Sequence, residues 1–174
     1  MHENYSGLTS SVKQREAGVH ITTSGFVDQS QIQIRKALEL HHNDVSIKIS
    51  IRNQGKKIID QLYGLEFNFG LLGGNTPDRY YLVNNKNVGA LNTQGDEAGV
   101  QTLGLINEWD NFKINMKFSE KCQLWRSPIE TISMSEAGFE RVYQASALLP
   151  HWKLNLSPGE SLELELLLSI NKFK

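Results

Sequence analysis

The chain has 174 residues, 39% of them hydrophobic and 21% charged, a composition typical of one globular domain rather than of a disordered segment. Its formal net charge of −1 leaves no basic excess to neutralise phosphates, which argues against a nucleic-acid-binding protein. No run of about 18 apolar residues is present, and the polar start MHENYSGLTSSVKQREAG has no apolar core, so the sequence predicts neither a membrane span nor a signal peptide.

The first 17 residues show no apolar period and are rich in small and polar residues. We therefore expect residues 1–17 to form a flexible N-terminal tail or linker ahead of a β-sandwich domain over residues 18–174. From residue 18 onward, apolar side chains recur at every second position. In residues 45–52, Val and Ile alternate with Ser, Lys and Arg. This alternation predicts a strand with one buried and one solvated face, and Asn53-Gln54-Gly55 predicts the turn after it.

The second half of the chain repeats the pattern, with turn signals between the runs. Residues 73–78 (GGNTPD) predict a loop, residues 84–99 predict loops around one short strand, and Asp110-Asn111 predicts the turn of a hairpin. The longest alternation, 162–170, sets Leu and Ile against Glu163 and Glu165. These runs give about ten to twelve strands and no helix. We predict an all-β fold, a two-sheet antiparallel β-sandwich, because each strand has one apolar face to bury.

The stretch Trp125–Gln144 mixes charged and apolar side chains on both strand faces. Because a bare buried charge is prohibitive, one interpretation is a structural network of ion pairs that fixes strand register. Its members would be Arg126, Glu130, Glu136, Glu140 and Arg141. The other interpretation is a carbohydrate-binding site, in which carboxylates and an arginine contact hydroxyls while an aromatic ring stacks on the sugar. Its candidate residues are Trp125, Glu130, Glu136, Arg141 and Tyr143.

Part of this stretch, PIETISMSEAGFERVYQ at residues 128–144, closely resembles a signature of the C-terminal domain of glycoside hydrolase family 57. Members of that family are α-amylases and 4-α-glucanotransferases that act on α-1,4-glucans. The segments YGLEFNFGLLGG and DRYY (63–74 and 78–81) and LLPHWKLNLSPGES (148–161) resemble other parts of the same domain. The family pattern has Gln at position 134 and Gly at positions 137 and 145, where this chain has Met134, Ala137 and Ala145. The resemblance runs over roughly residues 19–171 and keeps the order of the segments.

The resemblance implies a galactose-mutarotase-like or lectin-like β-sandwich. It also implies a non-catalytic C-terminal accessory domain of an α-1,4-glucan-acting amylase or glucanotransferase. The family's catalytic carboxylates belong to a barrel that no segment here resembles, so no catalytic residue is carried over to this chain. The expected partner is the catalytic barrel of the same full-length enzyme, encoded upstream, with α-glucan as a further candidate.

Two other functions stay open. A stand-alone carbohydrate-binding module would present an exposed aromatic plate, for which Trp109, Trp125 and Trp152 are the candidates. An exposed coplanar pair would favour this function, and three buried Trp would exclude it. An aldose-epimerase-like enzyme would need a His and a carboxylate converging on one pocket, and His151 is the histidine that falls inside the resembling segments.

Metal and cofactor signals are weak throughout. His41 and His42 are neighbours on a strand or in a turn, where adjacent side chains point to opposite faces. Asp96-Glu97 offers too few oxygen ligands for calcium, and the single Cys122 excludes a Cys-based zinc site and an internal disulfide. We expect Glu163 and Glu165 to lie on a solvated strand face. We expect no cofactor, no metal, no nucleic-acid or membrane partner, and a cytoplasmic location.

Overall fold

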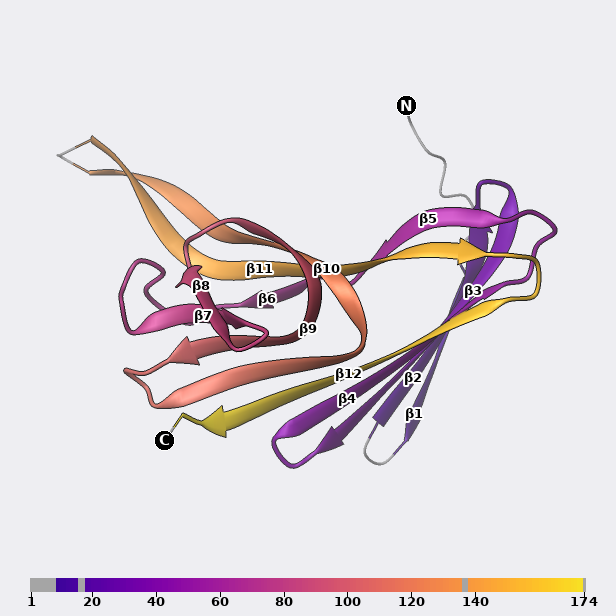
Figure 1. Ribbon diagram of the computed structural model, residues 1–174, viewed down its shortest axis with the longest axis horizontal. Helices are drawn as coiled ribbons and strands as arrows, with labels where there is room; N and C mark the ends of the chain where they lie inside the picture. Colours follow the sequence, from indigo (N-terminus) through magenta and orange to yellow (C-terminus); the bar gives the residue numbers. More distant parts are fainter. Residues whose placement is uncertain (1–8, 16–17, 136–137, 174) are drawn as a thin grey trace. The chain divides into compact units, whose positions relative to one another are not determined.

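The computed structural model describes residues 9–15, 18–135 and 138–173, and these residues form an all-β, antiparallel fold (Figure 1). The strands are β1 (Thr9–Arg15), β2 (Gly18–Val27), β3 (Ser30–His41), β4 (Asp44–Asn53), β5 (Ile59–Gly64), β6 (Phe67–Phe69), β7 (Arg79–Val83), β8 (Lys86–Ala90), β9 (Gly95–Asn107), β10 (Phe112–Ser135), β11 (Gly138–Leu156) and β12 (Ser161–Lys172). The described part of the chain contains no helix, and hence none that could cross a membrane. The predicted all-β class of antiparallel β-sandwich is confirmed.

The chain divides into two compact units, which we call unit 1 and unit 2. Unit 1 comprises the described residues up to Tyr63 together with Lys153–Leu168, and unit 2 comprises Gly64–Trp152 together with the end of the chain from Ser169. Strands β11 and β12 therefore each contribute residues to both units. Each unit has its own apolar interior, and we describe the two separately.

Unit 1 is built on the antiparallel order β1-β2-β3-β4-β12. Two-residue turns join β2 to β3 and β3 to β4. Asp28 and Gln29, with φ of 48° and 64°, connect β2 to β3, and His42, with φ of 53°, lies in the turn between β3 and β4. Such turns match the twist of the strands that they join. His41 ends β3 and His42 is in the turn, as predicted for this histidine pair.

Strand β1 lies in the stretch for which the sequence predicts a tail. It pairs antiparallel with β2 from Thr9–Ser24 to Arg15–Gly18 and has no partner on its other side in the strand order. The backbone ladder defines an edge strand of this kind without any alternation of apolar side chains. Apolar periodicity therefore does not reveal β1.

The interior of unit 1 is aliphatic, and a buried asparagine joins its turns. Its buried apolar residues are Ile32, Ile47, Ile49, Ile51, Ile59, Leu154, Leu156, Leu164 and Leu166. Asn53, which is fully buried, accepts a hydrogen bond from Ser30 Oγ at 3.0 Å and donates to the carbonyl oxygens of Lys57 at 2.7 Å and Leu156 at 2.9 Å. Its Oδ1 also accepts from Gly55 N at 2.9 Å, which forms the turn predicted at residues 53–55.

Unit 2 has the strand order β8-β7-β9-β10-β11-β6. Asn84-Asn85 joins β7 to β8, and residues 108–111, which include the turn predicted at Asp110-Asn111, join β9 to β10. The predicted short strand within residues 84–99 is β8, but residues 95–99, predicted as loop, are the first residues of β9. Strand β10 is one strand of 24 residues, with register shifts against β9 on both sides of Cys122. The apolar interior of unit 2 includes Tyr81, Leu91, Leu103, Leu105, Ile106, Phe118, Leu124, Leu148 and Trp152.

Candidate functional site

A buried arginine lies at the centre of unit 2. Arg126 of β10 is 6% exposed, and its Nε and Nη2 each donate to Glu97 Oε1 at 2.9 Å. Nη1 donates to Thr93 O at 3.0 Å and Thr93 Oγ1 at 2.5 Å, and Nη2 donates to Val88 O at 3.1 Å. The guanidinium carbon lies 4.8 Å from the centre of the Tyr81 ring. The guanidinium is thus paired and hydrogen-bonded along its whole edge, as a buried charge requires.

A chain of hydroxyl groups extends from this arginine. Tyr81, whose ring faces Arg126, donates to Leu91 O at 3.0 Å and lies 2.5 Å from Ser146 Oγ, which in turn lies 2.7 Å from Tyr143 Oη. Burial raises the pKa of Tyr81 to about 12 and also raises the pKa of Tyr143. Both phenols therefore stay neutral near pH 7 and serve as fixed hydrogen-bonding groups.

The partner of Arg126 differs from the sequence prediction. Glu97 is outside the predicted network, yet it is brought beside Arg126 because β9 pairs with β10, with Gly95 opposite Arg126. A Cβ atom at Gly95 would lie 2.5 Å from Arg126 Nε, so glycine leaves the space that the guanidinium fills. The sequence itself carries no local signal that pairs Glu97 with Arg126. Glu97 is paired with Arg126, and Asp96 beside it accepts a hydrogen bond from Gln123.

Beyond the buried network, β10 and β11 continue as a two-stranded hairpin, residues 130–135 and 138–143, which we call the arm (Figure 1). Three predicted site residues lie on it. Glu130 is directly opposite Tyr143, and Glu130 Oε2 lies 3.7 Å from Arg141 Nη1. The Arg141 side chain is 77% exposed and that of Glu130 is 26% exposed. Two members of the predicted network, Glu130 and Arg141, therefore form an ion pair, but at the surface rather than in a buried network. Glu136 lies outside the described residues.

Trp125 is separated from the other candidates. It alternates with Leu124 and Arg126, which face the interior of unit 2, and so it points to the outer face, away from Glu130. Its indole ring lies 4.3 Å from the His151 ring, centre to centre, and the residue is 45% exposed. The structure thus brings together Glu130, Arg141 and Tyr143, and leaves Trp125 on the other side of the sheet.

The other two tryptophans differ in burial. Trp152 is 7% exposed, packs edge-on against Phe118 at 6.0 Å and donates from Nε1 to Glu120 O at 3.2 Å. Trp109, in the turn between β9 and β10, is 78% exposed. Two of the three tryptophans therefore offer ring surface to a ligand, and the condition that would have excluded a binding module is not met.

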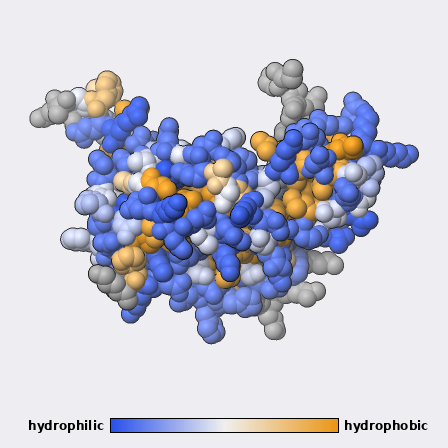
Figure 2. Space-filling model, in the orientation of Figure 1, coloured by the Kyte–Doolittle hydropathy of each residue, from blue (hydrophilic) through white to orange (hydrophobic). Residues whose placement is uncertain are grey.

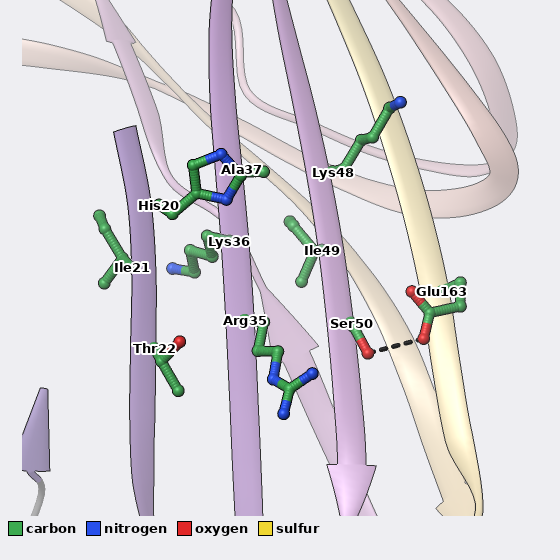
Figure 3. A pocket seen from close by; sticks show the side chains of 10 residues that line it. All are labelled: His20, Ile21, Thr22, Arg35, Lys36, Ala37, Lys48, Ile49, Ser50 and Glu163. Carbon is green, nitrogen blue, oxygen red and sulfur yellow. Dashed lines mark hydrogen bonds between the residues drawn. The ribbon is translucent and has the colours of Figure 1, made fainter. Parts of the chain in front are cut away.

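A shallow depression of about 180 Å³ crosses β2, β3, β4 and β12 on the polar face of unit 1 (Figure 3). Its polar lining includes His20, Arg35, Lys48, Ser50 and Glu163. Ser50 Oγ donates to Glu163 Oε1 at 2.6 Å. Glu163 and Glu165 are exposed while Leu164 and Leu166 are buried, which confirms the predicted solvated strand face.

This depression contains a His and a carboxylate, the pair that an aldose-epimerase-like enzyme would need. His20 on β2 and Glu163 on β12 are, however, three inter-strand steps apart, about 14 Å at about 4.8 Å per step. General acid–base catalysis needs both groups within hydrogen-bond reach of the reacting sugar. His151 is buried, and its Nδ1 lies 3.2 Å from Leu149 O. Within the described residues, no three His, Cys, Asp or Glu side chains gather as a metal site would require.

An apolar groove of about 380 Å³ lies in unit 1, between the β2–β3 turn and β5. Phe26 and Leu62, which are 62% and 60% exposed, contribute to its walls. The hydroxyl of Tyr63 is buried there and has no hydrogen-bond partner within the described part of the chain, and burial raises the pKa of Tyr63 to about 12. A largely apolar group with one hydrogen-bond acceptor would fit the groove, because the acceptor could take the hydrogen bond of the Tyr63 hydroxyl.

Comparisons with known proteins agree with this geometry. The family model described as "Alpha-amylase/4-alpha-glucanotransferase, C-terminal" matches residues 4–166. Alpha-amylase 1 of Dictyoglomus thermophilum is 29% identical over 165 residues, which cover 92% of this chain and 22% of that protein. The crystal structure of 4-alpha-glucanotransferase from Thermococcus litoralis matches with a TM-score of 0.67 at 15% identity, over 92% of this chain and 22% of the other. A galactose mutarotase-like protein from Clostridium acetobutylicum matches with a TM-score of 0.64 at 10% identity, over 95% of this chain and 66% of the other. At these identities the two structures show a shared fold, which is galactose-mutarotase-like.

Proposed function

The chain belongs to the family of C-terminal domains of α-amylases and 4-α-glucanotransferases, and from this premise we propose that it is a non-catalytic accessory domain of a longer enzyme that acts on α-1,4-glucans. One observation carries the proposal. The chain spans about a fifth of the length of the amylase and of the glucanotransferase that it matches. Most of each of those proteins thus lies outside the matched region.

The chemistry of the described residues supports a structural role. Glu97 binds the buried Arg126, Glu130 pairs with Arg141, and Glu163 accepts from Ser50. A glycosidase needs two carboxyl groups roughly 5–10 Å apart across one scissile bond, whereas these three are each held by a separate structural partner. The proposed partner is the catalytic part of the same enzyme, which this domain would brace. The buried free thiol of Cys122 is compatible with the reducing cytoplasm, which we propose as the location.

Direct contact with glucan is a second candidate function, favoured by the exposure of Trp109 and Trp125. Large aromatic rings that remain exposed are the usual stacking surface for sugar rings. Trp109 is 78% exposed beside Glu108 and Asp110, whose carboxylates could accept hydrogen bonds from sugar hydroxyls. The further proposed contacts are Trp125 on the outer face, Glu130, Arg141 and Tyr143 on the arm, and Glu136, which lies outside the described residues.

Calorimetric titration of the 174-residue chain with maltooligosaccharides, beside an assay for released reducing sugar, tests both functions. An accessory domain that only braces its enzyme gives neither heat of binding nor turnover. Binding that is lost in Trp109→Ala or Trp125→Ala, and kept in Leu72→Ala, assigns glucan contact to that tryptophan. Leu72 is the matched control because it is 77% exposed in the same unit. Turnover by the chain alone would overturn the proposal.

A further inference from the structure

The interior-facing side of β10 and β11 continues onto the arm. On β10, the even-numbered residues Leu124 and Arg126 face the interior of unit 2, and the same alternation puts Glu130, Ile132 and Met134 on that face. The arm therefore prolongs the surface that is covered in the body of unit 2. We call this its inner face.

A β-bulge brings β11 into step with β10 on this face. Ala145 pairs with Ile129, and Tyr143 pairs with Glu130, so Gln144 is an extra residue without an opposite partner. The extra residue reverses the alternation of β11, because consecutive side chains point to opposite faces. Odd-numbered Phe139, Arg141 and Tyr143 face inward before the bulge, whereas even-numbered Ser146 and Leu148 face inward after it.

The inner face of the arm is apolar at its end and uncovered. Ile132 is 69% exposed, and the opposed pair Met134 and Phe139 are each 79% exposed. The outer face instead carries Thr131, Ser133, Glu140 and Val142. Figure 2 shows hydrophobic residues at this end of unit 2. A two-stranded hairpin on its own is marginally stable in water. Because the larger apolar side chains of the arm lie on its inner face, we expect another surface to pack on that face.

We propose that the inner face of the arm is an interface on which the remainder of the longer enzyme packs, burying Ile132, Met134 and Phe139 and enclosing the Glu130–Arg141 ion pair. The inference rests on the proposed function, since it takes its occupant from the same protein. The relative lengths support that occupant, because the matched region is 22% of the amylase and 22% of the glucanotransferase chain.

The chemistry of the face defines the surface that fits it. Ile132 and Met134 have no group that can hydrogen-bond sugar hydroxyls, so a glucan is a poor occupant and an apolar protein surface is a good one. Next to the apolar end, the exposed guanidinium of Arg141 contacts Glu130 at 3.7 Å and presents further N–H donors outward. The complementary surface therefore has an apolar centre with a carboxylate or backbone carbonyl opposite Arg141.

Oxidative footprinting tests this interface, using the 174-residue chain and the full-length product of its gene. In the short chain, hydroxyl radicals should oxidise Met134 and Phe139 strongly. In the full-length product, oxidation of both should fall towards that of Met116, which is 1% exposed. Trp109, 78% exposed in the turn between β9 and β10, is the internal control that should stay oxidised in both.

The other outcomes each decide against the proposal in a different way. Equal oxidation of Met134 and Phe139 in both proteins would overturn the arm interface and leave the accessory function standing. A gene product that consists of these 174 residues alone would overturn both. Protection that grows with the concentration of the short chain would identify the occupant as a second copy.

A pair of variants provides a second readout. The double variant Met134→Ser/Phe139→Ser should lower the thermal unfolding midpoint of the full-length product and leave that of the short chain unchanged. Leu72→Ser, a control that removes an equally exposed apolar side chain from the same unit, should change neither. A double variant that behaves like the control would count against the interface.

Discussion

Two arginines on the same face of the paired strands β10 and β11 have opposite environments. Arg126 is 6% exposed and bound to Glu97, whereas the Arg141 side chain is 77% exposed and pairs loosely with Glu130. Strand alternation, together with the bulge at Gln144, makes both side chains point to the inner face. Only Arg126, however, has other strands of unit 2 packed over it. The comparison shows that parity decides which way a side chain points, whereas burial depends on whether another layer covers that face.

Removing the buried member of this pair should have the largest effect. Arg126→Met keeps most of the side-chain volume but leaves the half-buried Glu97 carboxylate without its counter-charge, and the Oε2 atom of Glu97 already has no hydrogen-bond partner among the described residues. We expect a loss of about 3–5 kcal/mol in the free energy of unfolding, measured by urea denaturation. The double variant Arg126→Met/Glu97→Gln should recover part of that loss, because the unpaired charge is gone. A single variant as stable as the wild type would mean that Arg126 is not the buried anchor.

The direction of the side chains on β10 can be read from the sequence, whereas that on β11 cannot. The alternation of β10 correctly places Arg126, Glu130, Ile132 and Met134 on one face, because a strand without an inserted residue keeps its period of two. Strict alternation along β11 would place Ala145 on the same face as Tyr143, which the structure does not show. The bulge at Gln144 separates them, and an inserted residue leaves no mark in the hydrophobic pattern.

The partner of Arg126 could not be read from the sequence either. Glu97 lies 29 residues away, and β9 and β10 shift register twice around Cys122 before they bring the two side chains together. Pairing register between such distant segments depends on these irregularities, which a local pattern does not encode. The exposure of the arm is hidden for a related reason. Its apolar residues have the same alternation as those of a covered strand, and the covering layer is a property of the fold.

The second prediction concerns alkaline pH, which should act on the buried phenols and thiol and spare the exposed end of the arm. Tyr81 has a pKa of 10.0 when exposed and about 12 in the folded state, because burial disfavours the phenolate. Above pH 10 the unfolded chain loses this proton first, so stability is fully present below pH 10 and is lost as the pH rises to about 12. A shift of this size corresponds to about 3 kcal/mol for Tyr81, and Tyr63 and Cys122, whose pKa values burial also raises to about 12, should add to the loss.

Urea denaturation at a series of pH values from 8 to about 12 measures this loss, the range being set by the two pKa values. In Tyr81→Phe the decline should be shallower, because one titrating phenol is removed. In Phe139→Ser, a variant of the arm, it should match the wild type. Identical slopes in wild type and Tyr81→Phe would contradict the assigned role of Tyr81.

The third prediction isolates the hydroxyl chain at neutral pH. Tyr81→Phe removes the group that bonds Leu91 O and Ser146 Oγ, and it leaves the buried Leu91 carbonyl with the longer 3.3 Å contact from Ser146. We expect a loss of about 1–3 kcal/mol in the free energy of unfolding. Tyr80→Phe is the matched control, because the Tyr80 hydroxyl bonds Glu108 at an exposed site, where water replaces the lost bond. Equal losses in both variants would show that burial of the Tyr81 hydroxyl has no energetic consequence.

The smallest effect is expected at the exposed arginine, and it is the result that most directly sharpens the comparison. In the 174-residue chain, Arg141→Ala breaks an ion pair in which the arginine is 77% exposed and the carboxylate is 3.7 Å away. Exposed pairs of this kind contribute about 0–1 kcal/mol, and salt screens them, so the free energy of unfolding should barely change and its dependence on ionic strength should be slight. The same substitution in the full-length gene product should cost clearly more, because there the inner face of the arm would be covered and Glu130 would be left unpaired away from water. The two arginines would then differ only in what covers them: strands of unit 2 for Arg126, and the rest of the enzyme for Arg141. A substitution that costs equally little in both proteins would instead place Arg141 permanently in solvent.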